Sequence, residues 1–258
     1  MKEEIIYYTD ELNDEFSKAK INPIKIDSKY KYHRGLLWEL CSYLLQNIIT
    51  MPIKLLHLRL KFKHEFIGKE KIKKYMNENK KQGFFIYANH TQSFADTHIP
   101  SMAVYPRRNF FIVNPENISM KGTKMLVEML GAIPIPGDIK STKSFIKRLE
   151  NRLNKGYIIS IYPEAHIWPY CTWIRNFKSV SFEFPKRFNK PFFTITNTYH
   201  KEKKKIKIIS YIDGPFFPDS NLSLKEDEKR LRDLAYNTMT KESKKSTYEK
   251  IKYIKKEN

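Results

Sequence analysis

Cysteine is scarce in this chain of 258 residues, where only Cys41 and Cys171 occur. The two lie in different segments, and the sequence contains neither a Cys-x-x-Cys pair nor a spacing typical of metal ligands. These patterns argue against a disulfide framework and favour a reducing, cytosolic compartment. They also give no reason to expect a bound cofactor or a metal.

Acidic residues are also in short supply. The chain carries 28 Asp and Glu against 48 Lys and Arg, which gives a formal charge of +20. Part of this lysine excess can reflect the base composition of the source genome. As a functional signal it favours a polyanionic partner: nucleic acid, an anionic membrane surface or a phosphorylated substrate. The sequence has no RNA-recognition, KH, zinc-finger or helix-turn-helix motif, so nucleic-acid binding is the less favoured alternative.

A secretory leader is not expected, because the first residues, MKEEIIYYTDELNDEF, are acidic and lack a basic start followed by an apolar core. An uninterrupted hydrophobic run of the length that spans a bilayer, about 20 residues, is missing as well. The most apolar window covers residues 35–60, and polar residues and a proline break it at Glu39, Gln46, Asn47, Pro52 and Lys54. Pro52 is expected to kink or end a helix.

Two interpretations of residues 35–60 stay open. The first is an interfacial helix in the lipid headgroup region, with Trp38 as its aromatic anchor and basic residues at its exit, namely Lys54, Arg59, Lys61 and Lys63. The second is a pair of helices packed on a protein core. A full membrane span is the least favoured reading.

Short apolar strands alternate with helical patterns along the rest of the chain. Strands are expected at residues 84–88, 109–113, 157–162, 191–197 and 206–212, with an edge segment at 131–137. Helices are expected at residues 69–81, 117–130 and 141–155, and after the capping box at 223–226. We expect Ser141 to be an N-cap, and Met125 and Met129 to fill the core.

This alternation predicts an α/β fold with a mixed, largely parallel sheet flanked by helices. We predict a single domain over residues 1–258. Residues 1–80 form a helical, membrane-associating lead and residues 81–215 form the core. Residues 216–258 form a charged helix and a Lys-rich tail that is either a solvated helix or partly disordered.

His90 follows residues 84–88, which are expected to form a fully buried strand, and Asp96 lies six residues further on. On a straight helix six residues turn by about 600°, so the two side chains meet only if the loop and first helical turn fold back. Such a pair could take a proton from a hydroxyl group, with the acid fixing the imidazole tautomer. The alternative is that His90 is a surface residue and that Asn89 or Ser93 is an N-cap.

Glu164 also follows a buried strand, directly after Pro163. Ligands of α/β proteins gather at the carboxyl ends of strands, so Glu164 and His90 are expected at the same rim of the sheet. The alternative for Glu164 is a carboxylate that complements a helix dipole.

Four sequence blocks now stand in one order: Asn89-His90 through Asp96, Gly131-Ala-Ile-Pro-Ile135, Tyr162-Pro-Glu-Ala165 and Pro191-Phe-Phe-Thr-Ile195. In these blocks, over residues 80–200, the chain resembles the glycerolipid acyltransferases, the lysophosphatidic acid acyltransferase-like enzymes. Phe177-Lys178 also lies where that family often has a Phe-Lys pair.

The chain departs from the family pattern at three places. Five residues separate His90 from Asp96 where the family usually has four, which makes His98 a second candidate neighbour. Gly137 stands where the family has a phosphate-binding Arg. Ala165 replaces a Gly, and His166 follows it. These changes suggest an acceptor other than plain lysophosphatidic acid.

The resemblance implies transfer of an acyl group from acyl-CoA or acyl carrier protein to a hydroxyl of a lysophospholipid or other glycerolipid acceptor. His90 would be the general base and Asp96 its orienting acid, with no Ser or Cys nucleophile. Backbone amides near Asn89 would be candidates for the oxyanion site. Substrate-binding residues would be Asn89, Gly131, Pro163, Glu164 and Lys178.

The implied partners are the lipid acceptor, the acyl thioester and an anionic membrane surface, without nucleic acid. The implied place is the cytoplasmic face of the cell membrane, with peripheral or monotopic attachment. A protein of this fold that binds lipid without catalysis is the main alternative.

Overall fold

The computed structural model describes residues 4–16 and 21–256. In this part of the chain a seven-stranded sheet has the order β2-β8-β7-β3-β6-β4-β5. Its central strands are β3 (Phe85–Ala88), β6 (Ile158–Ile161) and β7 (Phe192–Glu202), and its outer strands are β4 (Asn109–Val113), β5 (Ala132–Pro134), β8 (Lys205–Phe216) and β2 (Glu65–Ile67). Every pairing is parallel except the β7–β8 hairpin. The predicted mixed, largely parallel sheet is confirmed.

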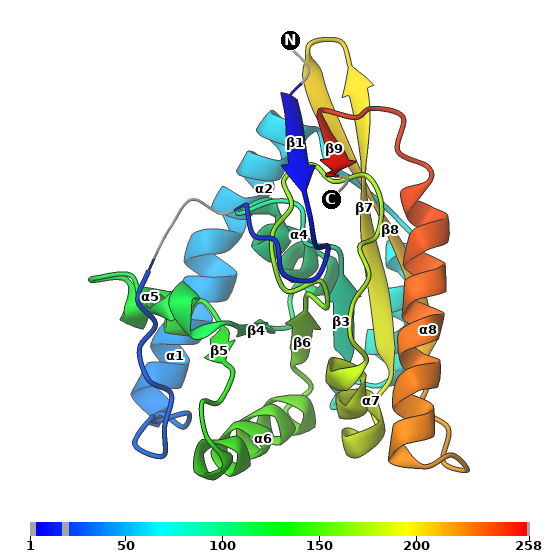
Figure 1. Ribbon diagram of the computed structural model, residues 1–258. Helices are drawn as coiled ribbons and strands as arrows, with labels where there is room; N and C mark the ends of the chain where they lie inside the picture. Colours follow the sequence, from blue (N-terminus) through cyan, green and yellow to red (C-terminus); the bar gives the residue numbers. More distant parts are fainter. Residues whose placement is uncertain (1–3, 17–20, 257–258) are drawn as a thin grey trace.

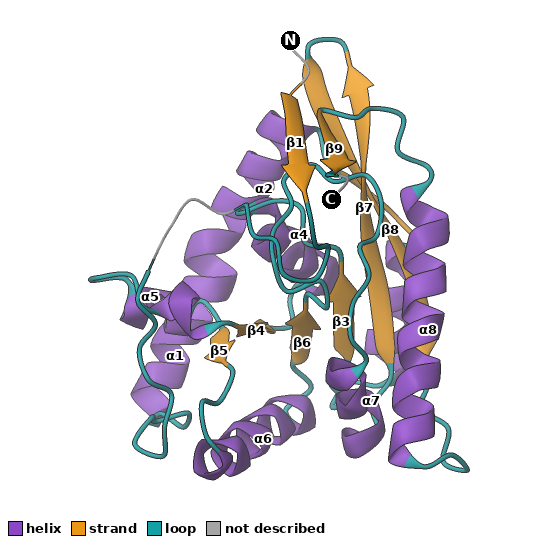
Figure 2. Cartoon of the chain, viewed as in Figure 1, coloured by secondary structure: helices purple, strands orange, loops and turns teal. Residues whose placement is uncertain are grey.

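Helices cover both faces of the sheet. Successive residues of β3 point to opposite faces, so both sets of side chains are buried. Phe85 and Tyr87 pack with α6 (Ile139–Asn154) and α8 (Leu224–Ser243) on one face. Phe84, Ile86 and Ala88 pack on the other face with α2 (Thr50–Phe62), α3 (Lys69–Glu78) and α4 (Ala95–Val104). Figures 1 and 2 show the sheet between these layers, with α8 upright on one side of the molecule.

One nearly continuous helical column carries the apolar window. It consists of α1 (Leu36–Leu44), a π-helical turn η1 (Leu45–Ile49) and α2. Figure 1 shows it in blue, running diagonally along one side of the molecule. Pro52 lies three residues into α2, and the π-helical turn stands directly before α2, so the proline coincides with a local irregularity and does not end the column.

A small parallel sheet joins the two ends of the described chain. It pairs β1 (Glu4–Tyr8) with β9 (Ile251–Lys255), and both strands were absent from the sequence prediction. Their side chains cover Trp168, which is fully buried. The Lys-rich tail is therefore neither a solvated helix nor a disordered end from residue 251 to residue 255.

Two local predictions were wrong. Asp138, not Ser141, is the N-cap of α6, and Ser141 is the third residue of that capping box. Residues 117–130 form only a 3-10 turn, η2 (Pro115–Ile118), and a short α5 (Lys124–Met129), with no buried residue in α5. Met125 is exposed and Met129 is only partly buried, so the two methionines do not fill the core.

The remaining elements are the 3-10 turn η3 (Val180–Phe182) and the short α7 (Glu183–Phe188).

Candidate active site

Asn89 fixes the end of β3 against β7. Its amide group donates to the carbonyl of Asn197 at 3.1 Å, and its side-chain oxygen accepts from the amide of Asn197 at 2.8 Å. The Asn89 side chain therefore makes the two hydrogen bonds that a further backbone pair between β3 and β7 would make. The next residue, His90, leaves the sheet at a defined point. The paired amide makes Asn89 a residue that holds the loop in place.

The loop after β3 folds back and brings the predicted pair together. Nδ1 of His90 lies 2.8 Å from Oδ2 of Asp96, in the first turn of α4. The same oxygen accepts the backbone amides of Thr91 and Gln92, each at 2.8 Å. One carboxylate oxygen thus organises the loop and the imidazole together, and five intervening residues are compatible with the dyad.

Asp96 is 1% exposed, and its second oxygen, Oδ1, has no hydrogen-bond partner among the described residues. Burial raises the pKa of Asp96 above its ordinary value, while the hydrogen bonds from His90 and the two amides act against that rise. A basic carboxylate at this place favours the His90 tautomer with a proton on Nδ1, which leaves Nε2 free to accept a proton.

Tyr162 holds the other side of the imidazole. Its ring stacks on that of His90 with centroids 4.4 Å apart, and its hydroxyl donates to the carbonyl of Asp96. The side chain of His90 stays 16% exposed. The Tyr162 ring therefore fixes the plane of the imidazole, and the Asp96 carboxylate fixes its rotation about the side-chain bonds. One edge of the ring stays accessible.

Glu164 binds the backbone of the loop that carries His90. Its Oε2 accepts the backbone amide of His90 at 2.8 Å, and its Oε1 accepts the amide of Arg175 at 2.9 Å. The Arg175 guanidinium pairs with Oε2 at 3.1 Å, and both side chains are buried. Both carboxylate oxygens are thus engaged inside the protein. This arrangement makes Glu164 a positioning residue, and its predicted contact with an acceptor stays a prediction.

The turn after Glu164 closes over the loop that carries His90. Ala165 has φ 63°, a left-handed conformation that favours glycine. Beyond it, the amide of Trp168 donates to the carbonyl of His90 at 3.1 Å, and the amide of Tyr170 donates to that of Thr91 at 3.1 Å. Since β1 and β9 pack on Trp168, both ends of the described chain support the loop that carries His90.

The backbone amides nearest the dyad are already in use. Those of His90, Thr91 and Gln92 donate to Glu164 or Asp96. The expectation that amides beside Asn89 bind an oxyanion is therefore not supported for these three, because each already donates to a carboxylate.

Two predicted residues are not brought to His90. Gly131 lies just before β5, which is three strands away from β3 in the sheet. The register across β4 and β6 places it level with Phe85, at the start of β3, whereas His90 follows the end of β3. Its φ of 108° and its packing against the carbonyl of Asn109 explain the glycine. Lys178 is exposed and has no ion-pair partner in residues 4–16 and 21–256. Substrate contacts by these two residues stay untested.

His98 points to a different partner. Its Nδ1 lies 3.1 Å from Nδ1 of His57 on α2, so His98 is not the neighbour of His90. Pro163, by contrast, lies in the turn between Tyr162 and Glu164, beside the dyad, where it stiffens the connection.

A model of the acyltransferase family matches residues 63–200, which is more than half of the chain. The chain belongs to the acyltransferase family. The dyad, Tyr162 and the Glu164–Arg175 pair all lie inside the matched region.

A comparison with curated proteins found no match for this acyltransferase. Among solved structures, it is similar to the 1-acyl-sn-glycerophosphate (LPA) acyltransferase PlsC from Thermotoga maritima. The two are 17% identical, the TM-score is 0.45, and the match covers 83% of this chain and 98% of that chain.

In the acyltransferase, the backbone of the segment around Ile26 packs directly on Gly137. The amide of Gly137 donates to the carbonyl of Ile26 at 2.8 Å, and a Cβ at residue 137 would approach that oxygen to 3.1 Å. The segment around Ile26 therefore covers the place where the resemblance has a phosphate-binding Arg.

The helical column α1–η1–α2 is apolar on the outside, and its inner face is polar from Ser42 to Lys54 and apolar only at its end, where Leu58 and Phe62 pack on the core. Ser42, Gln46, Asn47 and Lys54 are buried, while the exposed apolar surface consists of Leu36, Leu37, Leu40, Tyr43, Leu44, Ile48, Ile49, Ile53, Leu55, Leu56 and Leu60. Inner polar groups bond to core loops, as Ser42 does to the carbonyl of Met129. We call the outer residues the apolar surface. From residue 42 to residue 54 the column is therefore the reverse of a helix that packs its apolar face on a core.

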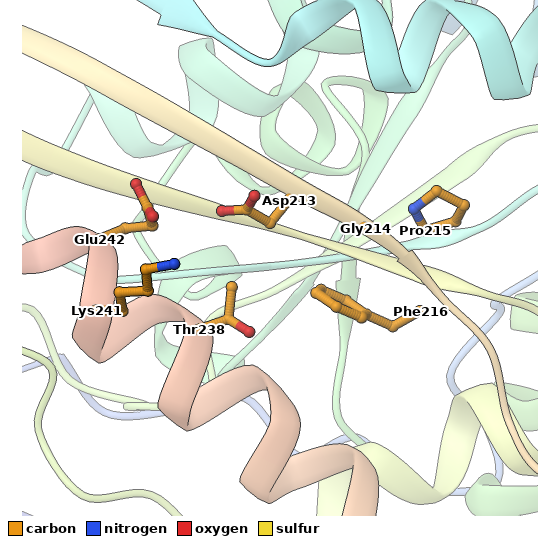
Figure 3. A pocket seen from close by; sticks show the side chains of 7 residues that line it. All are labelled: Asp213, Gly214, Pro215, Phe216, Thr238, Lys241 and Glu242. Carbon is orange, nitrogen blue, oxygen red and sulfur yellow. The ribbon is translucent and has the colours of Figure 1, made fainter.

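Across residues 4–16 and 21–256, no helix has both the length and the apolar character that crossing a bilayer requires. The same residues contain no cluster of three or more His, Cys, Asp or Glu placed to hold a metal ion. A hollow of about 330 Å³ lies between β8 and α8, where Figure 3 shows Asp213 and Glu242. Lys71 and Lys245 pair with those two carboxylates, while Lys241, which also lines the hollow, has no ion pair with any described residue.

Sequence reasoning missed Tyr162 and Arg175 as members of the site. Tyr162 carried a signal, since it precedes Pro163-Glu164 at the rim of the sheet. Arg175 carried none, because it is one of 48 basic residues and reaches Glu164 only through the fold.

Proposed function

We propose that this acyltransferase moves a fatty acyl group from a thioester, acyl-CoA or acyl carrier protein, to a hydroxyl of a lysophospholipid or similar glycerolipid at a membrane surface. The observation that carries the proposal is the dyad: an imidazole with Nδ1 on a buried carboxylate and one edge open. The four sequence blocks support the glycerolipid acceptor.

The chemistry needs no covalent enzyme intermediate. Nε2 of His90 takes the proton of the acceptor hydroxyl while the oxygen attacks the thioester carbonyl. Asp96 stabilises the imidazolium through Nδ1. The tetrahedral intermediate then collapses, the carbon–sulfur bond breaks, and the leaving thiolate takes up the proton from His90. The products are an ester and a free thiol.

The apolar surface supports action at the cytoplasmic face of a membrane. An exposed row of Leu and Ile along one helical column suits insertion into the interfacial region, and Arg59 and Lys61 at its end suit anionic headgroups. Phe94, exposed beside the dyad, extends this character to the mouth of the site. Attachment would be peripheral or monotopic.

The test is acyl transfer by the purified full chain. Acyl-CoA or acyl carrier protein thioester is supplied with a lysophospholipid in anionic vesicles, and both free thiol and diacyl product are measured. We expect turnover in the wild type and a fall in kcat of about 10³-fold in His90→Ala. The matched control is His200→Ala, which removes a half-exposed imidazole on β7. Full activity in His90→Ala would contradict the mechanism.

The same preparation tests the alternatives. Flotation with vesicles but no thiol release from any thioester would favour a lipid-binding role without catalysis. Retardation of RNA without flotation would favour the nucleic-acid alternative. The proposal requires both flotation and thiol release that depends on the acceptor.

A further inference from the structure

A buried tyrosine hydroxyl on β7 binds the loop that carries His90. The side chain of Tyr199 is fully buried, and its hydroxyl donates to Oγ1 of Thr91 at 2.6 Å. The same hydroxyl accepts Nε2 of Gln92 at 3.2 Å. Thr91 and Gln92 are the two residues whose backbone amides donate to Oδ2 of Asp96. One hydroxyl therefore binds both side chains of the segment that surrounds the carboxylate of the dyad.

The backbone of Tyr199 is anchored separately from its side chain. β3 pairs with β7 only as far as Ile195, so the edge of β7 beyond that residue is available to other segments. The segment that follows α8 uses it. The carbonyl of Tyr199 accepts the amides of Thr247 at 2.9 Å and Tyr248 at 3.1 Å, and its amide donates to Oγ of Ser246 at 3.2 Å. The hydroxyl is therefore attached to the sheet and not to the loop.

The hydrogen bonds of the Asp96 carboxylate meet at one atom. Oδ1 has no hydrogen-bond partner in the described part of the chain, and Oδ2 accepts both loop amides and faces Nδ1 of His90. A shift of Thr91 or Gln92 therefore changes the same oxygen that orients the imidazole. Burial, and then the charge of Asp96, raises the pKa of Tyr199 well above its ordinary value, so the hydroxyl keeps the proton that it donates.

Packing alone does not require a hydroxyl at this position. Tyr199 belongs to an apolar cluster in which the same face of β7 carries Phe193 and Ile195. A phenylalanine would fill the same volume, and a buried hydroxyl is costly unless it is bonded. Both side chains that bond to the hydroxyl belong to the loop that carries His90. What the oxygen adds to a phenylalanine is therefore the position of that loop.

We propose that Tyr199 is a positioning residue for the dyad, which holds Thr91 and Gln92 so that their amides and Nδ1 of His90 meet at Oδ2 of Asp96. Its effect on catalysis rests on the proposed function. In the described structure Tyr199 has no hydrogen bond to His90 or Asp96, and it acts on them through the loop. A misplaced base slows proton transfer without changing the contacts of the substrate, so kcat is expected to fall while KM changes little.

The first test removes a single oxygen atom. Tyr199→Phe keeps the ring, and we expect kcat for acyl transfer to fall by about 10–100-fold, with KM for acceptor and thioester within about twofold of the wild type. Tyr87→Phe is the matched control. It removes an equally buried hydroxyl, which donates to the carbonyl of Ser181 at 2.7 Å on the other face of the sheet, and its kcat should stay unchanged. An equal fall in both variants would overturn the proposal.

The second test is a double-mutant cycle. Thr91→Val removes the oxygen that accepts from Tyr199 and keeps the backbone amide and the size of the side chain. If the two residues act through one bond, the double variant should be no slower than the slower single variant. Losses that multiply would overturn the proposal. Thr91→Val also replaces Tyr199→Phe if the latter does not fold, and an unchanged kcat in Thr91→Val would then decide against it.

The third test is spectroscopic and needs no turnover. The imidazole nitrogen signals of the labelled full chain report the tautomer of His90 and the exchange of its Nδ1 proton, with His90→Gln as the assignment. We expect a protonated Nδ1 in the wild type and in Tyr87→Phe, and faster exchange or a mixture of tautomers in Tyr199→Phe. An unchanged His90 signal in a variant with lowered kcat would assign the loss to another part of the site and overturn the proposal.

These results separate this inference from the proposed function. If the wild type transfers acyl groups and Tyr199→Phe changes neither kcat nor the His90 signal, the inference fails while the function stands. If the wild type transfers nothing and Tyr199→Phe still alters the His90 signal, the function fails and the positioning of the dyad stands.

Discussion

Oδ2 of Asp96 lies 2.8 Å from Nδ1 of His90 although five residues separate the two in the chain. The loop makes room for the extra residue because the same oxygen also accepts the amides of Thr91 and Gln92. The acid therefore does two tasks at once: it shapes the loop and sets the imidazole tautomer.

Replacing this acid by its amide is expected to impair the base. Asp96→Asn presents an NH₂ group to Nδ1 or loses the backbone bonds, and either result favours the wrong tautomer of His90. We expect kcat to fall by about 10²–10⁴-fold. Thiol release at saturating acceptor measures this. Asp233→Asn, which alters a half-exposed carboxylate on α8, is the control, and an unchanged kcat in Asp96→Asn would remove Asp96 from the mechanism.

Breaking the buried ion pair beneath the loop should cost stability. Glu164→Gln removes the charge that compensates Arg175, and leaving one buried partner unpaired typically costs about 3–5 kcal/mol. Urea denaturation followed by tryptophan fluorescence measures the free energy of unfolding. Glu150→Gln, on the exposed side of α6, should change it by less than about 0.5 kcal/mol. A similar small loss in Glu164→Gln would show that the pair is not needed for folding.

The left-handed residue in the loop offers a stabilising change. Ala165 has φ 63°, which costs a non-glycine residue about 1–2 kcal/mol, while glycine loses about 0.5–1 kcal/mol more backbone entropy on folding. Ala165→Gly is therefore expected to raise the free energy of unfolding by up to about 1.5 kcal/mol in the same denaturation experiment. Ala235→Gly, within α8, should lower it by about 1 kcal/mol or more. A loss of stability in Ala165→Gly would contradict this account.

Glu39 should make folding sensitive to acid. Burial alone would raise its pKa, but the hydrogen bond and charge of Arg152, with the charges of Arg148 and Arg108, lower the pKa from 4.5 to about 2. A carboxylate with a lowered folded-state pKa stabilises the protein above its unfolded-state pKa, and this contribution disappears as the pH falls from about 4.5 to about 2. The shift corresponds to at most about 3 kcal/mol.

Thermal unfolding at several pH values measures this contribution. Glu39→Gln should be less stable than the wild type at pH 7, and the difference should shrink below pH 4.5. Glu150→Gln provides the comparison at each pH. A difference that does not depend on pH would mean that the charge of Glu39 is not what holds α1 to α6.

The apolar surface gives a prediction that separates binding from folding. Leu37 and Leu56 are exposed, so changing both to Asp removes little core packing. The double variant should keep its melting temperature and lose most flotation with anionic vesicles. Val180→Asp, an equally exposed apolar residue on η3, should still float. Unchanged flotation in the double variant would place the membrane contact elsewhere.

The features that could be read from the sequence were local ones. Buried strands such as residues 109–113 showed as apolar runs, and the capping box at Ser223 marked the start of α8. The dyad could be proposed because a His and an Asp at the end of a strand are few residues apart. Ser141 was misassigned because two polar residues can each cap the same helix, and only the backbone decides which one does.

The features that could not be read from it depend on distant contacts. Residues 4–8 (EIIYY) and 251–255 (IKYIK) are rich in Ile and Tyr, which strands favour, but each segment is short and its pairing partner lies at the other end of the described chain. The sequence also did not show which face of the helices over residues 36–62 points to the core. Their pattern is amphipathic either way, and the position of Glu39 among three arginines settles which side faces the core.

The pairing of β1 with β9 has a consequence for biosynthesis. The nascent chain can form its central sheet while the ribosome is still adding α8, but the covering over Trp168 requires residues 251–255 to emerge. Until then the loop beside His90 lacks its outer support. Activity is therefore expected only after residues 251–255 have been made and have paired with residues 4–8.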